Sequence, residues 1–181
     1  MHYPKAYIDF LIYFHTDRDY FECHEVLEEH WKTTPRKKGD HYWVALIQLA
    51  VGLYHERRQN LEGAKRMFTS SQRIIQNDPH AIKKLGLDTQ QLLEMINDRL
   101  NQMEHTESFS DMNLPIDDPR LLLECRTACE EKQLDWCAPS MLDREELVHK
   151  HSRRDRSEVI AERAIQLKKR KDSKQRGWNI T

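Results

Sequence analysis

The segment 21–31 has the sequence FECHEVLEEHW, which places a histidine and a glutamate one helical turn apart. On a helix with 3.6 residues per turn, His24 and Glu28 share a stripe with the apolar side chains and face inward. Glu25 belongs to the opposite face, and we expect it to be solvated. The pattern H-E-x-x-E also lacks the second histidine that the zinc metalloprotease motif requires at i+4. This helix therefore offers one histidine and one carboxylate for chemistry.

The next predicted helix carries a second pair of polar residues. Gln48 and His55 share one stripe, and Gly52 leaves a gap beside them. Together with His24 and Glu28 they could hold a divalent metal ion with one open position, because imidazole and carboxylate groups are common metal ligands. They could equally bind a small polar ligand. The alternative is a buried hydrogen-bonded network of the four side chains without a ligand.

The elements that must position these residues are predicted to be helices. Hydrophobic periodicity gives no strand in the first hundred residues. The predicted helices cover residues 3–15, 17–33, 40–58, 60–76 and 89–104, followed by weaker helices near 119–133 and 143–150 and a long one near 154–171. Four of them begin with a residue suited to an N-cap, namely Asp17, Asp40, Asn60 and Asp88.

The predicted helix at 40–58 is apolar on every side, which is typical of a central, buried helix. We therefore expect an all-α fold, in which helical hairpins surround one buried helix and a helical appendage follows. Residues 1–105 are predicted to form a five-helix globular domain. Residues 106–117 contain Ser, Asn and Pro and indicate a linker. Residues 118–181 form the charged appendage, which ends in a basic tail.

Composition excludes several classes of protein. The 181 residues include only 5 glycines, none in a G-x-G pair, so phosphate-cradling loops and dinucleotide-binding turns are absent from the sequence. No apolar run reaches the ~20 residues of a membrane-spanning helix. The N-terminus lacks the pattern of a secretory signal, and the 4 cysteines form no C-x-x-C pair. These features predict a cytoplasmic protein with free thiols.

Three segments carry a family resemblance: FECHEVLEEHW at 21–31, LIQLAV at 46–51, and YHERRQN at 54–60. As a set they resemble the bacterial and archaeal "domain of unknown function 309" family over roughly residues 5–75. The resemblance implies a small helical domain without an established biochemical activity. A weaker likeness to tetratricopeptide hairpins concerns packing alone, because the spacing of the two candidate units exceeds the period of about 34 residues.

Three functional hypotheses follow. The first is a binding or scaffold module with an internal His/Glu/Gln pocket that takes a protein partner or a small polar ligand. The second is a metal-dependent, hydrolase-like enzyme that uses His24, Glu28 and His55. The third is an adaptor whose basic tail binds nucleic acid or an anionic surface. Its candidate residues are Lys168, Lys169, Arg170, Lys171, Lys174 and Arg176.

Overall fold

A computed structural model describes residues 3–34, 41–105, 108–142 and 144–150. The prediction of an all-α fold is confirmed, since the described residues form helices and a single isolated β-bridge between Leu87 and Ile116. The helices are α1 (Lys5–His15), α2 (Tyr20–Thr33), α3 (His41–Arg57), α4 (Leu61–Asn77), α5 (Pro79–Lys84), α6 (Thr89–Glu104), α7 (Pro119–Glu131) and α8 (Glu145–Val148). None of these helices combines the length and the apolar character needed to cross a bilayer.

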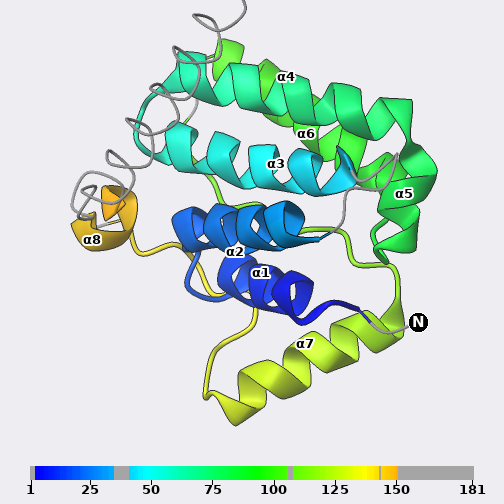
Figure 1. Cartoon of the computed structure of the whole chain (residues 1–181). Coiled ribbons are helices and arrows are strands. Elements are labelled where there is room, and N and C mark those ends of the chain that lie inside the picture. The colour runs from blue at the N-terminus through cyan, green and yellow to red at the C-terminus, as the bar shows by residue number, and fades with distance from the viewer. Residues whose placement is uncertain (1–2, 35–40, 106–107, 143, 151–181) are drawn as a thin grey trace, which may run out of the picture. The chain divides into compact units, whose positions relative to one another are not determined.

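The helices stack as successive layers around α3 (Figure 1). Helix α3 packs between α2 and α4, α1 covers the far side of α2, and α6 packs on α4. Helices α3 and α4 approach each other closely at Gly52, where an added Cβ would lie 2.6 Å from the Phe68 ring. Glycine at this position therefore lets α4 lie directly on α3, as expected for the central, buried helix.

The N-cap of α2 differs from the sequence prediction, while the predicted cap Asp40 lies outside the described residues. Helix α2 begins after Asp19, whose carboxylate accepts a hydrogen bond from the Glu22 backbone N–H, so the prediction of Asp17 as the cap is wrong. Arg18 intervenes with a positive φ of 53°. This left-handed residue turns the chain sharply between α1 and α2 and thereby delays the start of α2.

A sixth helix lies within the first 105 residues, where five had been predicted. Helix α4 ends at Asn77, and Asp78 and Pro79 follow it directly. In the structure the Asp78 carboxylate accepts from the Ala81 N–H and Pro79 occupies the first turn of α5. Proline favours this position because the first turn of a helix leaves its backbone N–H groups without intrahelical partners. The same residues therefore end one helix and begin the next.

The segment predicted to be a linker contributes to the core. Met112 and Leu114 are buried, and Asp88 donates its backbone N–H to the Pro115 carbonyl. Helix α7 then packs on α1 through the buried residues Leu121 and Cys125. Residues 1–148 form one compact unit. Independent folding of residues 1–105 stays a prediction, and such a fragment would lose all of these contacts.

Buried arginine side chains connect this later segment to the earlier helices by hydrogen bonds. Arg18 is only 2% exposed, and its guanidinium donates to the carbonyls of Phe14, Met112 and Ala138 and to the Asn113 side chain, at 2.8–3.1 Å. None of these four acceptors is a carboxylate. Backbone carbonyls that are buried outside regular structure need donors, and one guanidinium supplies five N–H groups.

Two further arginines act in the same way. Arg99 of α6 donates to both carboxylate oxygens of Glu56, at 2.8 and 3.0 Å, and to the Ser110 carbonyl at 2.9 Å. Arg57 donates to the Arg18 carbonyl at 2.7 Å and to the Leu147 carbonyl at 3.1 Å. Each of these side chains therefore joins α3 or α6 to a segment far away in the sequence.

His15 forms a fourth attachment. The Leu114 backbone N–H donates to His15 Nε2 at 3.0 Å, so Nδ1 carries the proton and donates to the Leu11 carbonyl at 2.8 Å. Trp136 stacks on the imidazole, with the ring centroids 4.4 Å apart. Burial lowers the pKa of His15 to about 4. A proton on Nε2 would remove the acceptor for the Leu114 N–H.

The stability of the protein should therefore decrease as the pH is lowered. The unfolded imidazole takes up a proton near pH 6.5, whereas the folded one stays neutral down to about pH 4. Stability present above pH 6.5 is lost between these values, and the shift corresponds to about 3 kcal/mol. Urea unfolding of the wild type and of His15→Gln at pH 7 and pH 4 measures this loss. The variant should lose less between the two pH values, while His80→Gln, an exposed control on α5, should behave like the wild type. Equal losses in all three proteins would contradict the assignment.

Candidate functional site

Helix α2 brings three potential metal ligands together. One ligand atom from each of His24, Glu25 and Glu28 lies within 4.8 Å of the others. The side chains of His24, Glu25 and Glu28 are 19%, 33% and 37% exposed, so the group is partly shielded from water. Among the described residues, this is the group of histidine, cysteine and carboxylate side chains with such spacing.

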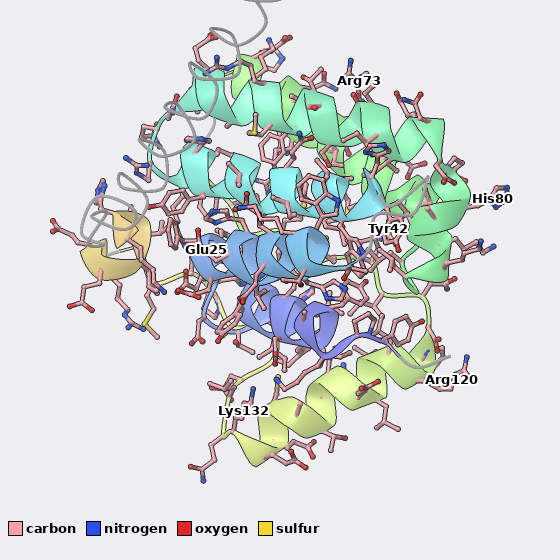
Figure 2. The ribbon with its side chains drawn as sticks, in the orientation of Figure 1. Glu25, Tyr42, Arg73, His80, Arg120 and Lys132 are labelled. Atoms are coloured by element: carbon pink, nitrogen blue, oxygen red, sulfur yellow. The ribbon has the colours of Figure 1, made fainter. Side chains whose placement is uncertain are left out.

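The position of Glu25 corrects the sequence analysis, which expected it to be solvated on the opposite face. Its carboxylate lies 3.1 Å from His24 Nε2 (Figure 2 labels Glu25 on α2). Neighbouring residues on a helix are 100° apart, but a glutamate has enough rotatable bonds to reach back to the side chain before it. The Phe21 ring packs against the imidazole of His24, with the centroids 4.8 Å apart. Glu28 is bound on its outer side by Lys32, at 3.0 Å.

Gln48 is a polar residue of α3 with an unmet hydrogen-bonding requirement. Its Oε1 atom is buried and has no donor within the described part of the chain. A buried acceptor without a donor is uncommon in folded proteins and calls for an explanation such as a bound ligand or water. Within the described residues Gln48 Oε1 accepts no hydrogen bond, from the three α2 residues or from any other, so the share of Gln48 in a common site stays a prediction.

His55 occupies a different environment from His24. Its Nδ1 lies 3.0 Å from the Asn60 amide nitrogen, at the turn into α4. Burial lowers the pKa of His55, and the positive charges of Arg58 and Arg66 lower it further. Two neighbouring cations oppose binding of a metal ion here by Coulomb repulsion. Of the four residues that the sequence grouped together, His24 and Glu28 thus lie in an acidic setting on α2, and His55 lies in a basic setting at the end of α3.

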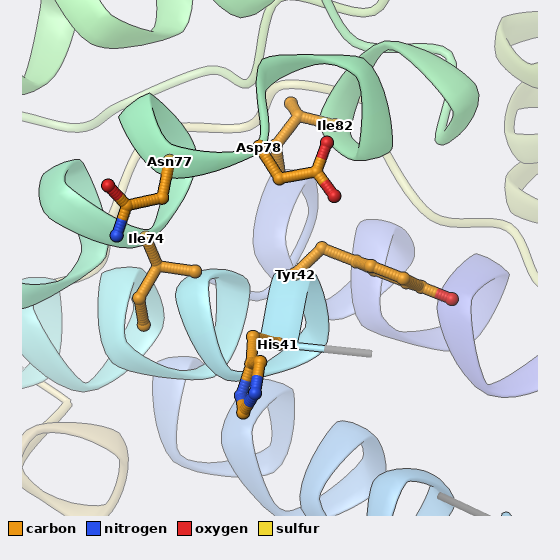
Figure 3. A pocket seen from close by; sticks show the side chains of 6 residues that line it. All are labelled: His41, Tyr42, Ile74, Asn77, Asp78 and Ile82. Carbon is orange, nitrogen blue, oxygen red and sulfur yellow. The ribbon is translucent and has the colours of Figure 1, made fainter. Parts of the chain in front are cut away.

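A separate cavity of about 160 Å³ lies where α3 begins and α4 ends (Figure 3). Its lining residues are His41, Tyr42, Ile74, Asn77, Asp78 and Ile82. The polar ends of His41, Asn77 and Asp78 point in different directions in Figure 3. A ligand site needs polar groups that converge on one point, so this cavity is a weaker candidate than α2.

The basic tail that the sequence analysis proposed as a binding segment lies outside the described residues. It comprises Lys168, Lys169, Arg170, Lys171, Lys174 and Arg176.

Comparisons with known proteins place the α2 and α3 residues in a domain matched by a family model. The model of the family "Domain of unknown function (DUF309)" matches residues 7–67, which include His24, Glu25, Glu28, Gln48 and His55. The chain is also 49% identical over 172 residues to "Uncharacterized protein YpuF" of Bacillus subtilis (strain 168). The chain belongs to the DUF309 family. The resemblance found in the sequence is thereby confirmed.

The similarity to this relative extends well beyond the DUF309 region. It covers 95% of this chain and 99% of the relative, so it includes most of the chain that follows α4. No solved structure matches the chain. The family description carries no activity, and the chemistry of DUF309 residues must therefore be argued from their geometry.

Replacement of Gln48 distinguishes a purely structural role from a ligand-binding role. The variant Gln48→Met keeps the length of the side chain and removes the buried acceptor that has no donor. If Gln48 only fills space, the free energy of unfolding of the variant should equal that of the wild type or exceed it by about 1 kcal/mol, because an unmet acceptor costs about 1–3 kcal/mol. Chemical denaturation measures the free energy of unfolding. The control is Gln76→Met, which changes an exposed residue of α4. A loss above about 1 kcal/mol, seen for Gln48→Met alone, would show that Oε1 has a partner in the apo protein.

Proposed function

We propose that this protein is a helical binding module and that its ligand is a divalent metal ion bound on α2. The observation that carries the proposal is the convergence of His24, Glu25 and Glu28 within 4.8 Å. One imidazole and two carboxylates form a ligand set suited to Zn²⁺ and similar ions. Three protein ligands leave a position for water or for a group of another molecule.

The surroundings of the three residues support this proposal. Partial burial makes the electrostatic attraction between carboxylates and a cation stronger than it would be in bulk water. The neighbouring Phe21 ring restricts the orientation of the His24 imidazole. Restricted ligands lose less entropy on binding.

We also propose the cytosol as the compartment of this protein. Cys23, Cys125 and Cys129 are buried thiols in the core, and Cys137 is exposed. Free cysteines of this kind are typical of proteins in reducing compartments.

Titration calorimetry of the tag-free, chelator-treated protein with Zn²⁺ tests the metal site. We expect one ion per chain and a rise in melting temperature, because an ion at 100 times its Kd adds about 2.7 kcal/mol of stability. His24→Gln and Glu28→Gln should weaken binding at least tenfold. Their matched controls are His80→Gln and Glu29→Gln, which change exposed residues and should bind like the wild type.

The alternative, a hydrogen-bonded network without a ligand, predicts a different result. In that case Zn²⁺ does not raise the melting temperature, and His24→Gln lowers the stability of the metal-free protein. Absence of saturable binding, or equal weakening in the control variants, would contradict the metal proposal.

A further inference from the structure

The segment that forms α4 and α5 differs in charge from the neighbouring helix α6. Residues 61–84 contain five Lys and Arg against two Asp and Glu, although the whole chain has a net charge of -1. The exposed charged residues of the neighbouring helix α6 are all acidic, namely Glu94, Asp98 and Glu104. Positive charge is therefore concentrated on one face, and it is not a general property of the chain.

Two arginines on this face have no internal partner. Arg66 and Arg73 are exposed on α4, and within the described residues neither forms an ion pair or a hydrogen bond. Arg73 projects from the outer side of α4 (Figure 2). Arg58, near the start of α4, has a buried Nε without an acceptor among the described residues. Lys65 differs from these three because it pairs with Glu104 at 2.9 Å. The exposed guanidinium groups of Arg66 and Arg73 are available to an external anion, whereas the Arg58 guanidinium lies over the Tyr54 ring, 5.2 Å from its centroid.

The side chains between the two arginines suit phosphate groups. An open hollow of about 360 Å³ is lined by Glu62, Lys65, Arg66, Thr69, Ser70 and Arg73. Arg66 and Arg73 are seven residues apart, so their backbones are separated by about 10 Å along the helix. This distance is too large for one phosphate and requires an anion that extends along α4. Arginine, serine and threonine side chains are common donors to the phosphate oxygens of nucleic acids.

An anionic membrane could also supply several phosphates, but the apolar residues argue against it. Helix α4 turns Ala64, Phe68 and Ile75 into the core. The large exposed hydrophobic side chains of the described residues are Leu123, Met141 and Leu142, which belong to α7 or follow it. Helices that lie on membranes insert an apolar face beside their basic residues. The basic face of α4 has no such residues.

We propose that the α4 face containing Arg66, Thr69, Ser70 and Arg73 binds the phosphodiester backbone of nucleic acid. The four side chains contact phosphates only, so binding is independent of base sequence and decreases with salt. This surface is distinct from the α2 metal site and does not depend on it.

Fluorescence anisotropy of a labelled 20-nucleotide single-stranded RNA with the full chain tests the proposal. The double variant Arg66→Ser, Arg73→Ser should bind roughly tenfold more weakly at low salt, and the slope of log K against log salt should decrease by about 1.4 for two lost phosphate contacts. The matched control is Arg126→Ser, Lys132→Ser, which removes two exposed charges at α7 and should bind nearly like the wild type. Circular dichroism verifies that both variants remain folded.

Two further binding experiments, with DNA and with vesicles, identify the class of anion. Single-stranded DNA of the same sequence should bind similarly, because the contacts are to phosphates, whereas preference for RNA alone would overturn backbone-only recognition. Vesicles containing phosphatidylglycerol should show no loss specific to the α4 variant. The proposal is wrong if the wild type fails to bind RNA at low salt, if both double variants weaken binding equally, or if the α4 variant affects vesicles and not RNA.

Discussion

The fold depends on the burial of a chain segment that has no regular structure. Residues 108–118 follow α6 and precede α7, they bury Met112 and Leu114 against the earlier helices, and most of their carbonyl groups lie outside helices and sheets. Arg18, Arg57 and Arg99 supply donors to such carbonyls in this segment and in those near Ala138 and Leu147. Burial of a guanidinium is costly unless its N–H groups are bonded, and all three nitrogens of Arg18 are bonded in this way, whereas the buried Nε of Arg57 and of Arg99 has no acceptor among the described residues. Helices α1, α3 and α6 are thereby connected to the later half of the described chain.

The same arrangement determines where ligands can bind. Helices α2 and α4 pack on two sides of α3. This packing leaves an edge of α3 with half-buried polar residues such as Gln48 and His55. The charges on either side of this edge differ. Glutamates on α2 create a setting for a cation, while Arg58 and Arg66 create one for an anion. One short hairpin array therefore offers two chemically different surfaces, which is consistent with a module that brings binding partners together.

Periodicity in the sequence was sufficient to predict the all-α class, because apolar stripes such as that of α4 depend on local spacing alone. It also identified the caps Asn60 and Asp88, whose side chains bond three residues ahead. Periodicity in the sequence could not predict the long-range contacts. Nothing local distinguishes Arg18, which is buried, from Lys5, which is exposed, because three of the four acceptors of Arg18 lie more than 90 residues later. The sequence analysis missed the pairing of Glu25 with His24, because it considered only the 100° between neighbouring residues on a helix. In the structure the Glu25 side chain turns toward His24.

Native-state hydrogen exchange at the Leu114 amide tests the central claim most directly. This amide donates to His15 Nε2, and in our account it opens only when the first six helices unfold as well. Its opening free energy should equal that of the most protected amides in α3, such as Leu49 and Leu53, at pH 7. Exchange at Leu114 several orders of magnitude faster than in α3 would show that residues 108–118 detach on their own. The buried arginines would then not unite the fold.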